Sequence, residues 1–473
     1  MEAIVTPSEM AAVDAAAPEP VEVLVERAGW AVAREAVDML GGTYGRRVVV
    51  VAGKGNNGAD GRSAGRFLRR RGVRVSVLDA SALHPDYELP DADLVIDAAY
   101  GTGFRGVWRP PRLPRSAPPV LAVDIPSGVV GLTGEVAGGP WPADRTVTFA
   151  AWKPGLLFGA GADLAGRVVV ADIGLDVSGA SSWLVDVGDL ATWAPARPRE
   201  SHKWRNAVWI VAGSAGMTGA AHLSTRAALR SGAGYVRLST PGTGPERFSG
   251  GPTEAVLTSL KRTGWASVVA AGAERFGALA VGPGLGVGDK VSAEVREVVA
   301  KVGRPIVVDG DGLRALGRDA DRVVAARAED AGPVVLTPHD GEFELLTGSR
   351  PGADRISAAR NLAAGTGAVV LLKGSTTVVA APDGTVFVSN AGDQRLATAG
   401  TGDVLTGVVV ALLAQGLPAP IAAVTAAVLH GRAASLGYRR GLVAGDLPDL
   451  LPAAQTEAFD AETSSSSTGM RRH

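Results

Sequence analysis

Short apolar runs recur along the chain, and each is bounded by glycine, proline or aspartate. In the first part of the chain they read "RVVVVAG", "VRVSVLDA", "DLVIDAAYG", "VLAVDIPSG", "RTVTFAA" and "RVVVADIG". These runs are β-branched, nearly continuous, and separated by segments of helix length. Such runs are typical of parallel strands that are covered on both faces. Most end in Asp or Gly, so polar residues are expected at the carboxyl edge of the sheet, where open α/β sheets bind ligands.

The same rhythm restarts after a segment rich in proline and charge, "LATWAPARPRESHKW", which begins at residue 190 and is the predicted linker. The later runs extend from "AVWIVAG" to "TVFVSN", and two apolar helices are expected at about 402–415 and 419–437. We therefore predict an α/β protein with two three-layer αβα domains, a Rossmann-like one over 1–195 and a second over 196–455. The polar, Ser-rich tail 456–473 is expected to be disordered.

Composition narrows the classes of partner. The 473 residues contain 47 Lys and Arg against 48 Asp and Glu, so no basic surplus indicates nucleic acid or an anionic membrane. The absence of cysteine excludes disulfides, thiolate catalysis and Cys-ligated metal sites. The N-terminus has no signal-peptide pattern, and no apolar stretch approaches the roughly 20 residues that span a bilayer. A cytoplasmic protein that binds small molecules, without a membrane or nucleic acid, is expected.

The most specific stretch is "LATAGTGDVLTGVVVALL" at 396–413. Its backbone N–H groups over Ala399, Gly400, Thr401 and Gly402 lead into a helix, and this arrangement binds anions such as phosphate. Asp403 follows in the first helical turn. A carboxylate beside an anion cradle can deprotonate a hydroxyl group while phosphoryl charge develops nearby.

Other polar side chains follow neighbouring strands of the second domain. Lys373 and the segment "GSTT" offer a cation and hydroxyl groups suited to nucleotide phosphates or ribose. Asp309, Asp311 and Glu342 follow two other strands, and carboxylates in a phosphate site commonly hold Mg²⁺ through water. His339 follows a proline and is either part of this site or a turn residue that caps the next helix.

These motifs resemble the ribokinase-like superfamily and, more closely, the ADP-dependent NAD(P)H-hydrate dehydratase family. The shared motifs are "GSAGMTGAAHLSTRAALRSGAGYV", "GPGLG", "TPHDGE", "LKGSTT" and "LATAGTGDVLTG", in this order over 200–455. The resemblance implies a ribokinase-like fold, with Mg²⁺·ADP bound by Lys373 to Thr377 and by Asp393 to Gly402. By residue, the implied ADP contacts are Lys373, Gly374, Ser375, Thr376, Thr377, Ala399, Gly400, Thr401 and Gly402, and the implied contacts to the hydrated nicotinamide are Ala220, Gly286, His339 and Asp403.

The implied reaction restores a dihydronicotinamide ring. Water added across the ring leaves a hydroxyl, which is a poor leaving group, and phosphate transferred from ADP makes it a good one. Asp403 is the expected base for the transfer. The chain departs from the family pattern in "SHKWRN", where Trp204 replaces a glycine, and this is expected to alter an entrance.

Three predicted strand ends in the first domain carry oxygen-bearing side chains: "GKGNNGADG", "DAAYGTGFRG" and "VDIPSG". Asn57, Asp97 and Ser127 could converge as oxygen ligands for a hard cation. Gly101 to Gly103 would provide a second backbone cradle for phosphates. Asp124, at a strand tip, is a candidate acid/base or an acceptor for a ribose hydroxyl.

This set, with "TFAAWKPGLL" and an N-terminal "SEMAAVD…LVERAG", resembles the NAD(P)H-hydrate epimerase domain over about 1–190. The resemblance implies K⁺ held by Asn57, Asp97 and Ser127, substrate contact and catalysis at Asp124, and a lesser role for Lys153. Ala59 replaces a glycine of the family pattern, and it would strain the loop if that position needed a positive φ. The implied contacts to the hydrated dinucleotide are Asn56, Asn57, Gly58, Ala59, Asp60, Gly101, Thr102, Gly103, Phe104, Arg105, Gly106, Val107 and Asp124.

The sequence thus predicts a homo-oligomeric repair enzyme that interconverts the R and S forms of hydrated NADH or NADPH and dehydrates the S form at the expense of ADP. One alternative is a ribokinase-like small-molecule kinase with a fused nucleotide-binding regulatory domain. Another is a non-enzymatic dinucleotide sensor, which would not need Asp403. A Rossmann dehydrogenase is disfavoured, since Asp79 alone lies near the position of the acidic residue that follows the glycine loop.

Overall fold

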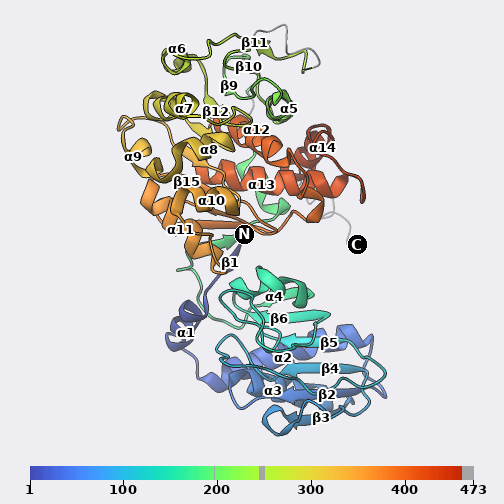
Figure 1. The fold of residues 1–473 in the computed structure, drawn as a ribbon. Coiled ribbons are helices and arrows are strands. Elements are labelled where there is room, and N and C mark those ends of the chain that lie inside the picture. Colours follow the sequence, from blue (N-terminus) through green and yellow to red (C-terminus); the bar gives the residue numbers. More distant parts are fainter. Residues whose placement is uncertain (197, 244–250, 461–473) are drawn as a thin grey trace. The chain divides into compact units, whose positions relative to one another are not determined.

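The computed structural model of the protein describes residues 1–196, 198–243 and 251–460. They form two compact units, one over Glu2–Trp183 and one from Leu184 onward that also includes Met1 (Figure 1). The units divide before the predicted boundary at 195/196, which stays a prediction. Of the predicted tail, residues 456–459 complete a helix, and the part from 461 lies outside the described residues.

The N-terminal unit is built on a sheet of six strands in the order β3-β2-β4-β5-β6-β7. All neighbours in this sheet are parallel, so the carboxyl ends of the strands meet at one edge. The strands are β2 (Arg47–Ala52), β3 (Arg74–Asp79), β4 (Leu94–Ala98), β5 (Val120–Val123), β6 (Arg145–Phe149) and β7 (Arg167–Ala171).

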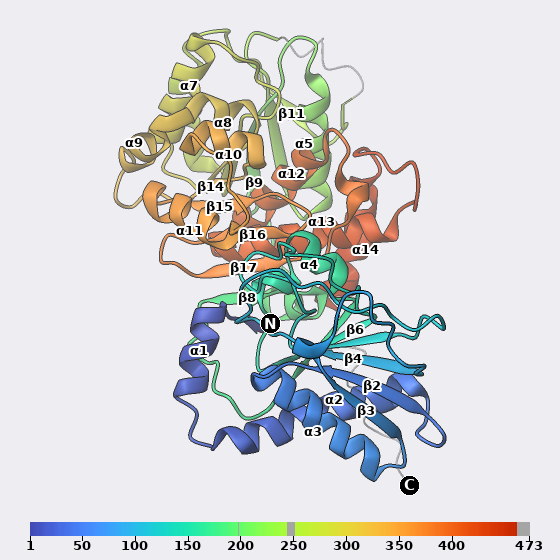
Figure 2. The ribbon, with the colours of Figure 1, turned by 60° about the horizontal axis from the view of Figure 1, so that its bottom comes forward.

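Helices α2 (Val21–Leu40) and α3 (Asn56–Arg70) lie next to one another and cover one face of this sheet (Figure 1, Figure 2). They approach closely because α2 has a glycine at the crossing: a Cβ at Gly29 would lie 2.4 Å from the Cβ of Ser63. The other face packs on irregular segments that carry the buried Trp108 and Trp141. Two further helices are α1 (Pro7–Ala15) and α4 (Gly159–Leu164).

The sheet of the C-terminal unit runs in the order β17-β16-β15-β14-β13-β12-β9-β10-β11. Neighbours are parallel from β11 to β15, and β15, β16 and β17 pair antiparallel. The strands are β9 (Ala207–Val211), β10 (Tyr235–Ser239), β11 (Val256–Leu257), β12 (Ala278–Val281), β13 (Ile306–Val308), β14 (Val334–Leu336), β15 (Val369–Leu372), β16 (Thr377–Ala380) and β17 (Val386–Ser389).

Two late apolar helices, α12 (Thr401–Ala414) and α13 (Ala419–Leu436), lie close to their predicted positions and are buried on nearly all sides. Within the described chain only α13 has the length and composition to cross a bilayer, and 72% of it is buried, as in a core helix. The predicted α/β class is confirmed in both units. The remaining helices are α5 (Thr218–Arg230), α6 (Trp265–Gly272), α7 (Asp289–Lys301), α8 (Asp311–Leu316), α9 (Ala320–Ala325), α10 (Asp340–Thr347), α11 (Arg355–Thr366) and α14 (Leu447–Phe459).

Candidate active sites

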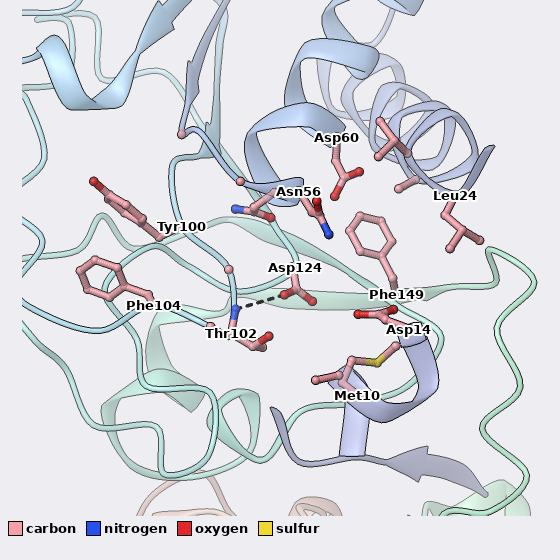
Figure 3. A pocket seen from close by; sticks show the side chains of 18 of the residues that line it. Met10, Asp14, Leu24, Asn56, Asp60, Tyr100, Thr102, Phe104, Asp124 and Phe149 are labelled. Atoms are coloured by element: carbon pink, nitrogen blue, oxygen red, sulfur yellow. Dashed lines mark hydrogen bonds between the residues drawn. The ribbon is translucent and has the colours of Figure 1, made fainter. Parts of the chain in front are cut away.

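A cavity of about 740 Å³ opens at the carboxyl edge of the N-terminal sheet (Figure 3). Helix α1 and the start of α2, which carry the N-terminal motifs of the epimerase resemblance, add walls to it. Of the predicted residues, those that line it are Asn56, Asn57, Asp60, Gly101, Thr102, Gly103, Phe104, Asp124 and Lys153, and unpredicted lining residues include Met10, Asp14, Leu24 and Phe149. The lining does not include Gly58, Ala59, Asp97, Arg105, Gly106, Val107 or Ser127.

The loop from β2 into α3 is compact because two of its glycines touch backbone. A Cβ at Gly53 would lie 1.9 Å from the carbonyl oxygen of Ala99, and one at Gly58 would lie 1.9 Å from that of Gly53. These contacts exclude any side chain at either position. Ala59, in contrast, is a residue of α3 and has no positive φ. The strain considered for alanine at this position does not arise.

Asp124 follows β5 in the left-handed region, with φ at 66°, which is uncommon for a residue with a Cβ. This conformation brings its carboxylate to the cavity wall (Figure 3). The Thr102 N–H and the Thr148 hydroxyl donate to it over 3.3 and 3.2 Å. The Nζ atom of Lys153, a residue only 1% exposed, lies 3.3 Å from its Oδ1 atom. A buried cation and two hydrogen-bond donors thus hold the side chain of Asp124 in place.

Two other carboxyl groups face the same cavity. Burial, followed by the negative charges of Asp124 and Asp14, raises the pKa of Asp60 to about 8. Burial also raises the pKa of Asp14, and the charge of Lys153 partly offsets this effect. At neutral pH, Asp60 is therefore mainly protonated. It shares the cavity with Asp124, which is paired with the Lys153 ammonium.

Asp97 and Ser127 are fully buried beside the cavity and bonded to each other. The Ser127 hydroxyl and N–H donate to the two oxygens of Asp97, over 2.6 and 2.9 Å. Burial raises the pKa of Asp97. Both amide atoms of Asn57 are buried without a hydrogen-bond partner. A buried carboxylate and an orphaned amide oxygen fit a hard cation.

No group of three or more His, Asp or Glu side chains suited to a metal ion occurs within 1–196, 198–243 and 251–460. A cation near Asp97 would therefore also need amide, hydroxyl or carbonyl oxygens.

In the C-terminal unit, Asp309 lies at the centre of a group of polar side chains. It follows β13 and is 3% exposed. The Lys373 ammonium and the Thr337 hydroxyl donate to its Oδ1 atom, over 2.8 and 2.7 Å, and the Thr406 hydroxyl donates to Oδ2 over 2.8 Å. Lys373 also lies 3.5 Å from Glu342. Despite burial, which opposes ionisation, these partners hold the pKa of Asp309 below its usual value. The network fixes Lys373 at the carboxyl edge of the sheet.

Asp403 lies in the first turn of α12, above this network. Gly400 precedes the helix with φ at 93°, and a Cβ at Gly402 would lie 3.4 Å from the Nζ atom of Lys373. Burial, followed by the charge of Asp309, raises the pKa of Asp403 to about 7, and Lys373 opposes this shift. The structure thus brings together a helix N-terminus, a cation and a carboxyl group that titrates near neutrality.

The two segments predicted to contact ADP also meet. Gly374, Ser375, Thr377 and Asp393 line a pocket of about 50 Å³. His430 of α13, which sequence reasoning missed, lines it as well. This histidine is 6% exposed, its Nε2 atom has no partner, and burial lowers its pKa to about 4. A neutral imidazole therefore faces this pocket.

The residues predicted to contact the hydrated nicotinamide lie in loops that converge at the same edge. The Gly286 N–H donates to Asp311 over 2.8 Å, and a Cβ at Gly284 would lie 3.1 Å from the Cβ of Ala220. His339 is the N-cap of α10, since its Nδ1 atom accepts from two backbone N–H groups. The capping role that the sequence left open is observed, and its exposed ring lies 3.5 Å from Glu342, the neighbour of Lys373.

Comparisons with known proteins match this geometry. The NAD(P)H-hydrate dehydratase family matches residues 208–456, and the family of YjeF-related N-termini matches 21–90 and 78–155. A bifunctional NAD(P)H-hydrate repair enzyme of Mycobacterium tuberculosis is 39% identical over 85% of this chain and 87% of its own. One of Moorella thermoacetica is 36% identical over 95% and 96%. The chain belongs to the bifunctional NAD(P)H-hydrate repair enzymes.

Solved structures agree for the C-terminal unit. A ribokinase-like superfamily protein of Enterococcus faecalis has a TM-score of 0.51 and 22% identity, over 59% of this chain and 96% of its own. The predicted ribokinase-like fold is confirmed. A Bacillus subtilis ADP/ATP-dependent NAD(P)H-hydrate dehydratase, co-crystallised with ATP/Mg²⁺, is 33% identical over 56% and 94%, with a TM-score of 0.49. By its family, this repair enzyme combines NAD(P)H-hydrate epimerase and NAD(P)H-hydrate dehydratase activities.

Trp204, the departure in the dehydratase domain, lies away from the candidate site. It precedes β9 and stacks on Tyr235, the first residue of β10, with ring centroids 4.3 Å apart. Arg275 lies 4.4 Å from its ring. Because β9 and β10 are parallel, this cluster is at their amino ends, opposite the carboxyl edge. The expectation that Trp204 alters an entrance to the site was wrong.

Proposed function

We propose that each domain performs one of the two activities at its own carboxyl edge, with Asp124 and Asp403 as the catalytic residues. The arrangement of Lys373, Asp309 and Asp403 at the start of α12 is the observation that supports the dehydratase site most strongly. The Lys153–Asp124 ion pair at the wall of the cavity, with the raised pKa of the nearby Asp60, supports the epimerase site. The other predicted contact residues keep their proposed roles.

In the dehydratase site, Asp403 removes the proton of the C6 hydroxyl of the hydrated ring. The oxygen attacks the terminal phosphorus of the nucleotide, and the bond to the bridging oxygen breaks, which releases AMP from ADP. Lys373 and the backbone N–H groups at the start of α12, such as that of Gly402, would stabilise the charge that develops on the phosphoryl oxygens. The N1 lone pair then expels phosphate from C6, and loss of a proton from C5 restores the ring double bond.

In the epimerase site, the configuration at C6 inverts with no net change in atoms. A hydrated nicotinamide is a hemiaminal, so C6 bears both a hydroxyl and the ring nitrogen. Breaking and reforming one of these bonds from the other face interconverts R and S. Proton transfer is the only catalysis that this needs, and Asp124 is the proposed acid/base.

Two cations belong to the proposal. Asn57, Asp97 and Ser127 would hold K⁺, whose charge would help to bind the pyrophosphate of the dinucleotide next to the Gly101–Gly103 loop. In the other domain, Mg²⁺ would bridge the phosphates of ADP and supply positive charge during transfer. Both oxygens of Asp309 already accept hydrogen bonds, so Asp311 and Glu342 are the better candidates to reach Mg²⁺ through water. A preference for ADP, a homo-oligomeric assembly and a cytoplasmic location stay predictions.

The test is to incubate the protein with a mixture of R and S hydrated NADH, ADP and Mg²⁺, and to follow the absorbance of the dihydronicotinamide. Full recovery of NADH is expected, because the epimerase converts R to S while S is consumed. Asp403→Asn should abolish recovery but leave the interconversion of the hydrates intact. Loss of both activities in a folded variant would contradict two separate sites, and a stable phosphorylated product would favour the small-molecule kinase.

A further inference from the structure

Asp60 is a buried carboxyl group without a partner at the wall of the epimerase cavity. It belongs to α3, is 7% exposed, and points into the cavity (Figure 3). From the described part of the chain, no hydrogen bond or ion pair reaches its carboxyl group. Its oxygens are not sealed off in the protein interior but are accessible from the cavity, so a bound ligand can supply their partner.

Asp124, in contrast to Asp60, has hydrogen-bond donors and a cation as partners. Its carboxylate accepts from Thr102 and Thr148 and lies against the Lys153 ammonium, whereas Asp60 has only negative neighbours. The remaining ionisable side chains around the cavity are Asp14, Glu19, Lys54 and Tyr100. Two carboxyl groups of one cavity therefore have contrasting surroundings, one paired with a buried cation and one without a partner, and such a contrast is how enzymes separate a base from an acid.

We propose that Asp60 is the general acid of the epimerase and delivers its proton to the ring nitrogen N1 of the hydrated nicotinamide. This inference rests on the proposed epimerase function. Asp124 removes the proton of the C6 hydroxyl, a C6=O bond forms, and the C6–N1 bond breaks. Its electron pair moves to N1, which takes the proton of Asp60. The product is a ring-opened aldehyde.

Reclosure completes the cycle. After rotation about the C5–C6 bond, N1 attacks the other face of the aldehyde and returns its proton to the Asp60 carboxylate. The new oxyanion takes the proton held by Asp124. Both groups recover their starting states, and no water, oxidant or cofactor is consumed.

Other groups at the wall fit the acid role less well. Lys153 uses its ammonium to hold Thr148, two backbone carbonyls and Asp124. Asp14 belongs to α1, and the charge of Lys153 opposes the rise of its pKa. Asp163 of α4 is the matched control, since it is an exposed aspartate of the same domain and does not line the cavity.

The experiment measures R/S interconversion by proton NMR for wild type, Asp60→Asn and Asp163→Asn. Asp60→Asn keeps the shape of the side chain but removes the acid, so kcat should fall by about 100-fold or more with KM nearly unchanged. Asp163→Asn should stay within about threefold of wild type. Asp60→Glu, which restores a carboxylic acid, should recover part of kcat. A rise in KM at unchanged kcat would show that Asp60 only binds substrate, and would overturn the proposal.

Two further readouts separate the possible failures. If wild type itself does not interconvert the hydrates, the proposed epimerase function is wrong. If Asp60→Asn is fully active while Asp124→Asn is inactive, only the role of Asp60 as the general acid is refuted. If Asp60→Asn does not fold, the wild-type pH profile decides. The interconversion kcat should decline on the alkaline side as Asp60 loses its proton, and a profile that stays flat to pH 10 would overturn the proposal.

Discussion

The Lys153 ammonium lies 3.3 Å from the Asp124 carboxylate, and it is one of the largest fully buried side chains of the protein. Removal of this charge by Lys153→Met leaves a carboxylate and three oxygen acceptors without their donor. We expect R/S interconversion to fall by about 100-fold. The N-terminal domain should lose about 3 kcal/mol of unfolding free energy, as for a broken buried pair.

Lys54→Met is the control for this prediction. Lys54 lines the same cavity but is exposed, so neither the rate nor the stability should change appreciably. Thermal unfolding and NMR exchange measure the two effects. A Lys153→Met variant with wild-type interconversion would show that the Asp124 carboxylate does not need the cation.

The dehydratase should lose activity as the pH falls. Asp403 accepts a proton only when ionised, and burial beside Asp309 raises its pKa to about 7. Below this pH the carboxyl group is protonated, so kcat/KM should fall by about tenfold per pH unit, and above it the rate should level off. Stopped-flow absorbance from pH 5 to about 9 would measure this limb, with R/S interconversion as the internal control. A limb near the usual aspartate value, about 4, would exclude Asp403 as the base.

Asp309 and Lys373 form a buried ion pair in the dehydratase site, and each charge stabilises the other. Lys373→Met leaves the buried Asp309 charge uncompensated and should destabilise the C-terminal domain by about 3 to 5 kcal/mol. Asp309→Asn together with Lys373→Met should recover part of that loss, because the uncompensated charge is gone. Chemical denaturation of the four proteins in this cycle tests the coupling. Additive losses would show that the two side chains do not interact.

Much of both candidate sites could be predicted from the residues at the ends of the predicted strands. Runs of β-branched residues that close on Asp or Gly located the edge where Asp97, Asp124 and Asp309 now lie, since parallel strands bring their carboxyl ends together. The start of α12 was equally clear, because glycines before an apolar helix have a specific backbone role.

What the sequence did not indicate depends on contacts between distant segments. Asp14 of α1 reaches the cavity across the fold, and no local pattern near it signals a ligand. His430 is hidden in an apolar helix, where a single histidine usually packs in the core. Trp204 was expected to alter an entrance, although its position before the strand "AVWIVAG" already puts it at the amino end of β9, away from the carboxyl edge.

Two neighbouring residues in the first turn of α3, Gly58 and Ala59, are predicted to respond differently to substitution. Gly58→Ala would place a Cβ 1.9 Å from the Gly53 carbonyl oxygen, so the loop must shift, and R/S interconversion should be largely lost. Ala59→Gly restores the residue of the family pattern. It should still lower stability by about 0.5 to 1 kcal/mol without raising activity, because Ala59 is helical. Thermal unfolding and NMR exchange decide, and a more active Ala59→Gly would contradict the helical assignment.

The cation proposed beside Asp97 should be detectable without any turnover. If K⁺ binds the folded N-terminal domain, its melting temperature should rise with K⁺ concentration at constant ionic strength, with tetramethylammonium as the replacement ion. Asn57→Ala removes the orphaned amide and should reduce this rise. Asn56→Ala, a change at the exposed neighbour, should retain it. An equal rise in the melting temperature of wild type with K⁺ and with tetramethylammonium would contradict a K⁺ site. Asp97 and Ser127 would then only stabilise the loops after β4 and β5 through their mutual hydrogen bonds.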